Sequence, residues 1–170
     1  MKLAKKKHAN RQLTHILGGT MKNSYKILAI NPGSTSTKIA VYENENLIFR
    51  ETIYHSNSDL EKFDKIIDQF EYRKKIILDT IKKQNFNLNE LDAVAGRGGN
   101  FKPVEGGTYK VNQKMIKDLI IGVMGHHPSN LGAIIADAIA KELGLSAYVV
   151  DPVVVDELEE YARISGMPEI

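Results

Sequence analysis

Three short apolar runs stand close together near the start of the chain, and the segments between them are too short to form a helix. The runs are YKILAIN (Tyr25–Asn31), KIAVYE (Lys38–Glu43) and LIFRETIY (Leu47–Tyr54). Each has the length and the residue types of a β-strand. Parallel neighbours in a sheet need a crossover of a dozen or more residues, so strands joined this closely run antiparallel. The sequence therefore predicts a three-stranded antiparallel meander.

The rest of the chain alternates helical and strand-like patterns. Ser58 and Glu61 are spaced as a capping box, and apolar residues then recur at helical spacing to about Lys83. The other predicted elements are a strand at Leu91–Gly96, helices near Gln113–Met124 and Ser129–Leu143, a strand at Ala147–Asp151 and a last helix at Val155–Ile164. The order β-β-β-α-β-α-β-α predicts an α/β fold with a mixed sheet. It is also the order of the ribonuclease H-like lobe found in actin-like and sugar-kinase-like proteins.

Composition narrows the classes of function. The 170 residues are 42% hydrophobic and 26% charged, which is typical of a globular protein. No apolar run is long enough to cross a bilayer, so we expect no membrane partner. The absence of cysteine excludes a disulfide scaffold, thiolate chemistry and a cysteine zinc site, and it fits a reducing cytoplasm.

The first twenty residues differ in charge from the rest. They carry five cations and no acid, so a net charge of +2 leaves residues 21–170 at −3. Residues 21–170 are therefore mildly acidic and lack the excess of positive charge that is typical of nucleic-acid-binding proteins. We predict that residues 1–20 are a basic extension, disordered or not native, with Met21 as the natural start; a targeting peptide or a nucleic-acid arm is the alternative. Residues 21–170 are then one lobe.

The turn after the first strand has the composition of a phosphate-binding loop. It reads INPGSTSTK from Ile30 to Lys38. Its backbone N–H groups are potential phosphate donors, and Gly33 allows a close approach. Four consecutive hydroxyl residues and then Lys38 add side-chain donors and a positive charge. An ordinary β-hairpin turn also favours Asn, Pro, Gly and Ser, and that alternative stays open on composition alone.

A second candidate loop follows the fourth predicted strand. Gly96-Arg97-Gly98-Gly99 stands where ligands usually bind in an open α/β sheet, at the carboxyl end of a strand. The guanidinium of Arg97 can bind a carboxylate or phosphate through two hydrogen bonds. The alternative is an arginine that caps a helix or forms a surface ion pair.

Two further segments carry polar groups of interest. Gly125-His126-His127-Pro128 precedes a predicted helix, but adjacent side chains diverge and no third ligand follows at a suitable spacing, which argues against a metal site. Asp151 ends the last predicted strand. Its carboxylate is placed either to hold a Mg²⁺ that bridges phosphate oxygens or to cap the next helix, and spacing alone does not decide between the two.

These motifs together resemble the acetate and butyrate kinase (acetokinase) family. NPGSTSTK is similar to its first phosphate motif, GRGGNFKPVEGGTYKVN resembles the segment around its acyl-site arginine, and HHPSN resembles an HNPAN-type motif that lines the acyl site. The first two are closer to the butyrate kinase branch. The chain lacks the longer spacing and second histidine of an HRVVHGG-like acetate kinase pattern, so the alignment of Arg97 to acetate kinases is approximate.

The resemblance implies a set of site residues. The residues implied to bind the nucleotide phosphates are Asn31, Gly33, Ser34, Thr35, Ser36 and Lys38. Arg97 is implied to be catalytic and to meet the substrate carboxylate and the transferring phosphoryl group, with His127 and Asn130 also contacting the substrate. Asp151 is implied to lie beside the transferred phosphoryl group and, with Asn31, to hold Mg²⁺.

The implied function is a cytoplasmic, ATP- and Mg²⁺-dependent butyrate kinase that forms butanoyl phosphate from butanoate. In this family a second half carries the adenosine pocket, a further phosphate loop and an arginine and a histidine that stabilise the transition state, and none has a counterpart here. We therefore expect little or no activity from this chain alone, and full-length members are expected to be homo-oligomers.

Several alternatives stay open. One alternative is a non-catalytic lobe that binds phosphate or a partner half. Another is part of a kinase for acetate, propionate or branched-chain acids. A nuclease of the same fold is disfavoured, because such chemistry needs carboxylates near the first strand and that strand carries none.

Overall fold

A six-stranded mixed sheet forms the centre of the molecule. A computed structural model of the chain describes residues 22–159 and residue 161. The strands are β1 (Lys26–Pro32), β2 (Ser36–Glu43), β3 (Asn46–Tyr54), β4 (Ala93–Gly96), β5 (Thr108–Lys110) and β6 (Ser146–Val150), in the spatial order β3-β2-β1-β4-β6-β5. The pairs β1–β2, β2–β3 and β5–β6 are antiparallel, whereas β1–β4 and β4–β6 are parallel. The predicted meander and the ribonuclease H-like arrangement are confirmed.

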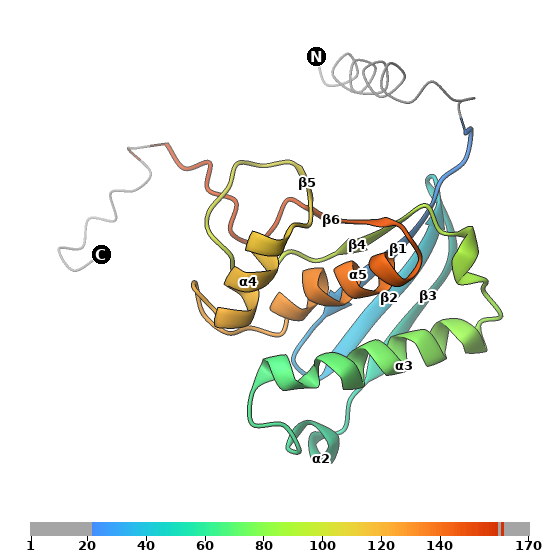
Figure 1. The fold of residues 1–170 in the computed structure, drawn as a ribbon, viewed down its shortest axis with the longest axis horizontal. Coiled ribbons are helices and arrows are strands. Elements are labelled where there is room, and N and C mark those ends of the chain that lie inside the picture. Colours follow the sequence, from blue (N-terminus) through green and yellow to red (C-terminus); the bar gives the residue numbers. More distant parts are fainter. Residues whose placement is uncertain (1–21, 160, 162–170) are drawn as a thin grey trace.

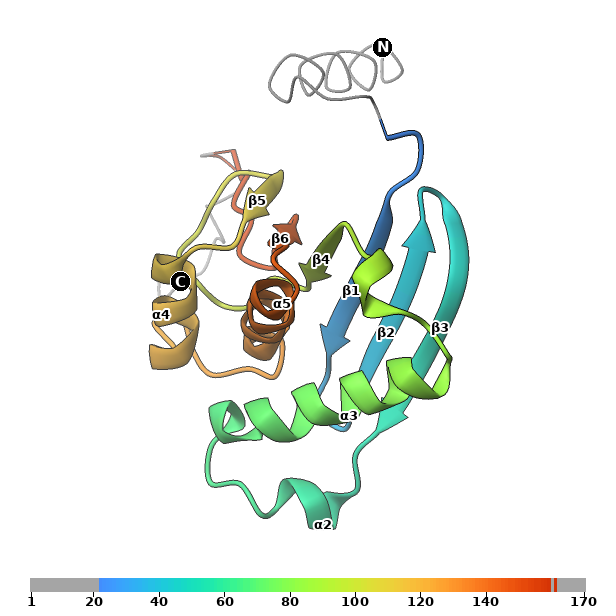
Figure 2. The ribbon, with the colours of Figure 1, turned by 45° about the vertical axis from the view of Figure 1, so that its right-hand side comes forward.

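The helices pack mainly on one face of this sheet. They are α2 (Asn57–Leu60), α3 (Phe70–Lys83), α4 (Gln113–Ile121) and α5 (Asn130–Glu142), with 3₁₀ turns η1 (Ile66–Gln69) and η2 (Leu88–Glu90). Figures 1 and 2 show α3 and α5 on the same side of the sheet, with α5 over β4 and β6 and α3 crossing toward β3. No helix in the described ranges is long and apolar enough to cross a membrane.

Alternation along β1 and β2 separates the two faces of the sheet. Leu28 and Ile30 of β1 and Ile39 and Val41 of β2 are buried in the core with the helices. Successive side chains of a strand point to opposite faces, so the residues between them lie on the other face. Those intervening residues are half-buried or exposed. The sheet therefore has one apolar packed face and one open face.

The start of the long predicted helix is wrong. The capping residue is Ser56, whose Oγ accepts the N–H of Asp59 at 3.1 Å, rather than Ser58 with Glu61. The helix that it caps is the short α2. A second start at Lys65, whose N–H donates to Asp68 Oδ2 at 3.1 Å, leads through η1 into α3. The predicted end at Lys83 is confirmed.

Two other expectations need correction. The strand β5 is missing from the predicted elements; it lies between the predicted strand at Leu91–Gly96 and the predicted helix near Gln113–Met124, and it pairs with β6 at the sheet edge. No helix begins at Val155. That residue forms an isolated bridge with Val104, and Asp156 N–H donates to Val104 O at 3.1 Å, so the chain is held extended there. The rest of this predicted helix, and the basic extension of residues 1–20, lie outside the described residues.

Candidate functional site

The predicted site residues lie along one edge of the sheet. β1, β4 and β6 run parallel, so their carboxyl ends meet at the same edge. Asn31 is near the end of β1, Arg97 directly follows β4 and Asp151 directly follows β6. Nη1 of Arg97 donates to Oδ1 of Asn31 at 3.3 Å. The sheet thus brings together two residues that are 66 positions apart in the sequence.

A tight turn joins β1 to β2 at this edge. The N–H of Gly33 donates to the carbonyl of Ser36 at 2.7 Å, which closes the turn, and Ser34 and Thr35 are exposed at its tip. The backbone itself does not demand glycine here, because a Cβ at position 33 meets Ser36 O at an ordinary 3.4 Å and Gly33 is not among the residues with positive φ. The turn therefore presents hydroxyl and backbone groups to solvent without backbone strain.

A cavity of about 730 Å³ lies on the open face of the sheet beside this turn. Its floor is built from Ala95, Ala29 and Ala40, which are consecutive partners across β4, β1 and β2. Alanine side chains are short, so their row leaves a depression between the larger residues on either side. The positively charged residues that line the cavity are Lys38, Arg50 and Arg97. The cavity therefore has an apolar floor and a positively charged rim.

The lining polar residues come from adjacent strands. Lys38 is the register partner of Asn31 on β1 and of Thr52 on β3. The one lining acid, Glu51, accepts a hydrogen bond from Gln84 Nε2 at 2.7 Å. This arrangement favours an anionic ligand with a small apolar part.

Close backbone packing holds the loop that carries Arg97. A Cβ added to Gly96 would lie 2.2 Å from Gly132 O on α5, and one added to Gly132 would lie 2.3 Å from Arg97 O. Arg97 N–H also donates to Ile30 O at 2.8 Å. Such distances leave no room for a side chain at Gly96 or Gly132. The backbone of Arg97 is therefore packed closely between β1 and the first turn of α5.

A buried arginine that sequence reasoning missed lies behind the phosphate turn. Arg73 of α3 is 1% exposed. Its guanidinium donates to Gly33 O at 2.9 Å, Ser34 O at 3.0 Å and Thr37 Oγ1 at 3.0 Å. Its Nε donates to Gln69 Oε1 at 3.0 Å. Burial lowers the pKa of Arg73, yet guanidinium groups stay protonated in proteins.

A second missed residue, His55, extends the same buried network. Its Nε2 lies 2.8 Å from Thr37 Oγ1, while its Nδ1 is buried with no hydrogen-bond partner among the described residues. Burial, and then the positive charge of Arg73, lower the pKa of His55 to about 4. The imidazole is therefore neutral near pH 7.

The other predicted site residues are placed differently. Asn130 is 3% exposed, and its amide group binds backbone only: Oδ1 accepts from Asn100 N at 2.9 Å, and Nδ2 donates to Gly125 O at 3.1 Å and Leu119 O at 3.3 Å. This geometry favours a positioning role for Asn130 over the predicted contact with substrate.

His127 is exposed and its ring orientation is defined. Its Nδ1 accepts the N–H of Ser129 at 3.2 Å and lies 2.8 Å from Ser129 Oγ. A nitrogen that accepts a backbone N–H carries no proton, so the proton of the neutral ring is on Nε2. His127 can therefore offer one N–H donor to a ligand, and its contact with substrate stays a prediction.

Asp151 contacts the loop that precedes β5. Its Oδ1 accepts the N–H of Gly107 at 2.7 Å, and its backbone lies in the left-handed region at φ 39°. The neighbouring Val150, rather than Asp151, lines the cavity. Within the described part of the chain, no group of three or more metal-ligating side chains occurs. The structure thus places Asp151 at the expected edge but gives no contact between it and Asn31.

Comparison with known proteins finds close relatives in sequence. No protein-family model matches the chain. It is 61% identical over 146 residues to butyrate kinase 2 of Clostridium acetobutylicum, 58% identical over 146 residues to butyrate kinase 1 of the same organism, and 56% identical over 147 residues to a probable butyrate kinase of Clostridium botulinum. Each match covers 86% of this chain and 41% of the relative, so the chain spans about 41% of the length of these relatives.

Solved structures with a similar arrangement are more distant. They include an acetate kinase from Entamoeba histolytica (TM-score 0.49, 16% identity, 85% of this chain and 39% of that chain) and a propionate kinase from Francisella tularensis (TM-score 0.47, 17% identity, 81% and 39%). Because 86% of the chain matches butyrate kinases at 56–61% identity, the chain is a homologue of butyrate kinases.

Proposed function

We propose that this chain is the part of a butyrate kinase that binds butanoate and the phosphate being transferred. The observation that carries the proposal is 61% identity to butyrate kinase 2 of Clostridium acetobutylicum over 86% of the chain. The reaction is butanoate plus ATP giving butanoyl phosphate plus ADP. A carboxylate oxygen of butanoate attacks the γ-phosphorus in line, the new P–O bond forms, and the bond to the bridging oxygen of ADP breaks.

The protein contributes positive charge and positioning to this step. Negative charge accumulates on the transferring phosphoryl group, and no protein nucleophile is needed. Lys38 and Arg97 line the same cavity and come from adjacent parts of the sheet edge. We assign Arg97 to the substrate carboxylate and the phosphoryl group. Asn31, the Gly33–Ser36 turn and Lys38 are assigned to the phosphates, and His127 to the edge of the substrate site.

The row of alanines supports a short acyl chain as the ligand. Ala29, Ala40 and Ala95 form an apolar floor beside the cationic rim. A carboxylate bound by Arg97 would leave its hydrocarbon tail over this floor. One methylene changes binding by only about 1–3 kcal/mol, so acetate, propionate and branched-chain acids are close competitors.

The proposed kinase assignment implies a metal ion. Mg²⁺ accepts one or two protein carboxylates together with phosphate oxygens and water. Asp151 can supply one carboxylate and Asn31 an amide oxygen, which fits Mg²⁺ only when the nucleotide supplies the remaining oxygens. When bound, the ion neutralises phosphate charge. Oδ1 of Asp151 also orients the Gly107 backbone, so the carboxylate has a structural contact in addition to the assigned one.

The complete enzyme requires more than this chain. The relatives are longer, with 59% of their length outside the match. We propose that residues 21–170 are one lobe, that a further lobe completes the nucleotide site, and that the assembled protein is a cytoplasmic homo-oligomer without nucleic-acid or membrane partners. The lobe alone is expected to form no butanoyl phosphate.

A chimaera tests the proposal. The matched 146 residues of Clostridium acetobutylicum butyrate kinase 2 are replaced by those of this chain, and acyl hydroxamate formation is measured with ATP, Mg²⁺ and butanoate. The expected result is activity in the chimaera and none in the 170-residue chain alone. Acetate, propionate and branched-chain acids, assayed in parallel, rank the substrates. A folded chimaera that is silent with every acid would contradict the kinase assignment and favour a non-catalytic lobe.

A further inference from the structure

Arg73 has no assigned role, although it is a charged side chain that is almost wholly buried. It lies on α3, across the sheet from the cavity, because its partner Thr37 faces the core while the next residue, Lys38, lines the cavity. We infer that Arg73 is a positioning residue that holds the phosphate turn in its binding shape. The inference deepens the proposed function and rests on it for the identity of the ligand.

The hydrogen bonds of Arg73 orient the turn's free donors. In a trans peptide, C=O and the following N–H point in opposite directions, and the described residues include no cis peptide. The carbonyls of Gly33 and Ser34 point at the guanidinium. The N–H groups of Ser34 and Thr35 therefore point away from it.

These two N–H groups are available to a ligand. Neither donates a hydrogen bond to another described residue, and both residues are exposed. Successive outward N–H groups in a turn form an anion-binding concavity. Arg73 thus selects the backbone shape that a phosphate oxygen needs, without touching the phosphate.

The charge of Arg73 acts in the same direction. Its hydrogen-bond partners are carbonyl, hydroxyl and amide oxygens, all neutral, and none of the ion pairs between described residues includes it. Within the part of the chain that the structure describes, Arg73 is therefore a cation without an ion-pair partner, and it lies directly behind the turn. A core arginine that served only packing would not need to converge on this one turn.

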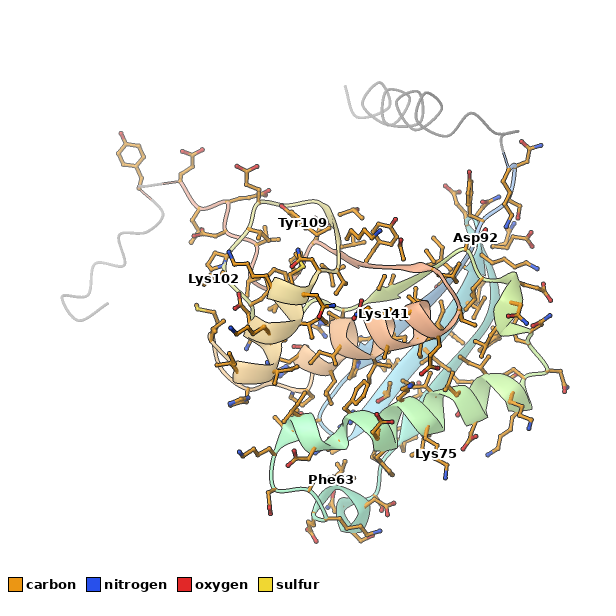
Figure 3. The ribbon with its side chains drawn as sticks, viewed as in Figure 1. Phe63, Lys75, Asp92, Lys102, Tyr109 and Lys141 are labelled. Carbon is orange, nitrogen blue, oxygen red and sulfur yellow. The ribbon has the colours of Figure 1, made fainter. Side chains whose placement is uncertain are left out.

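The experiment compares three variants of the full 170-residue chain. Arg73→Lys keeps the charge but loses the planar fork, and Arg73→Met removes both. Lys75→Met is the matched control, since Lys75 is an exposed cation on the same helix that extends away from the sheet (Figure 3). Amide hydrogen exchange is measured at Gly33, whose N–H is bonded to Ser36 O, and along α5. Binding of inorganic pyrophosphate is measured by titration.

We expect Arg73→Lys to raise exchange at Gly33 by about tenfold and to weaken pyrophosphate binding by about tenfold, since each lost bond involves a charged donor. Exchange along α5 stays at the wild-type rate, and Lys75→Met changes neither measurement. Arg73→Met is expected to give the larger effect. If it does not fold, Arg73→Lys carries the test.

Two results would overturn the inference. One is unchanged exchange at Gly33 in Arg73→Lys. The other is faster exchange spread equally over Gly33 and α5, which is the behaviour of a residue that only stabilises the core. If the wild-type chain binds no pyrophosphate, the assigned phosphate site of the proposed function fails, and the local exchange pattern at Gly33 still decides the role of Arg73.

Discussion

At the scale of single residues, the sequence identified candidate residues at the ends of strands but missed the contacts that form inside the core. Asn31 near the carboxyl end of β1 and Arg97 directly after β4 were both identified as candidates, although the hydrogen bond between them was not predicted. The contacts of Arg73 with Thr37 and the phosphate turn join residues 36 to 40 positions apart through a packed interior, and no local pattern encodes that distance. A signal was present: Arg73 occupies a position between Phe70 and Ile77 on the apolar side of α3, where a charged residue is out of place.

The first prediction concerns Arg97. In the chimaera, Arg97→Gln is expected to lower kcat/KM for butanoate by about 100-fold or more, or about 2.7 kcal/mol, because glutamine keeps a donor but loses the charge opposite the phosphoryl group. The hydroxamate assay measures the change. Lys75→Gln serves as the control and is expected to leave the rate unchanged. Equal rates for Arg97→Gln and the parent would contradict the assignment.

A second prediction follows from buried His55. The unfolded chain binds a proton at this side chain near pH 6.5, whereas the folded chain does so only near pH 4, because burial holds its pKa down. Between these values the unfolded state binds more protons, so stability falls as the pH falls, by about 1.4 kcal/mol per pH unit and up to about 3 kcal/mol in total.

Urea unfolding at several pH values between 7 and 4 measures this dependence. His55→Gln removes the titrating ring and should flatten that part of the profile, whatever its effect on stability at pH 7. A profile as steep as that of the parent chain would show that other groups are responsible.

At the scale of elements, most helices and strands were predictable, and the exceptions have physical causes. β1, β2, β3, β4, β6, α4 and α5 lie where periodicity placed them. β5 has three residues and exists through its pairing with β6, a contact too distant for local periodicity to indicate. The apolar spacing through Phe63 and Ile66 suggested one helix, but capping at Ser56 and Lys65 divides it.

The packing of β4 against α5 gives a third prediction. Gly96→Ala and Gly132→Ala place a Cβ within 2.2–2.3 Å of backbone oxygen, and backbone cannot move aside as a flexible side chain can. Each is expected to lower the free energy of unfolding by about 2 kcal/mol or more. Gly33→Ala is the matched control and is expected to change it by less than about 0.5 kcal/mol. Thermal or urea unfolding measures all three, and equal losses would contradict the close approach.

At the scale of the whole molecule, the sheet depends on a strand from the far end of the described chain. β6 lies between β4 and β5 and also packs under α5. Its parallel pairing with β4 and antiparallel pairing with β5 join segments distant in the sequence. Removal of β6 would therefore open both the sheet and the core.

Truncation tests this dependence. A chain that ends at Leu145 lacks β6, and we expect it to show no cooperative thermal transition by circular dichroism, because β4 and α5 lose their apolar partner Val149. A chain that ends at Glu159 retains every described strand and is expected to unfold cooperatively. A cooperative transition in the shorter chain would contradict the central role of β6.

The position of β5 has a consequence for the newly made protein. β5 is synthesised before β6, its strand partner among the described residues, since β6 begins 36 residues after β5 ends. At roughly 5–20 residues per second, that delay is about 2–7 s. During it, Thr108–Lys110 has no strand to pair with, and one edge of β4 is open to other extended chains. Until β6 is synthesised, the sheet lacks the strand that joins β4 to β5.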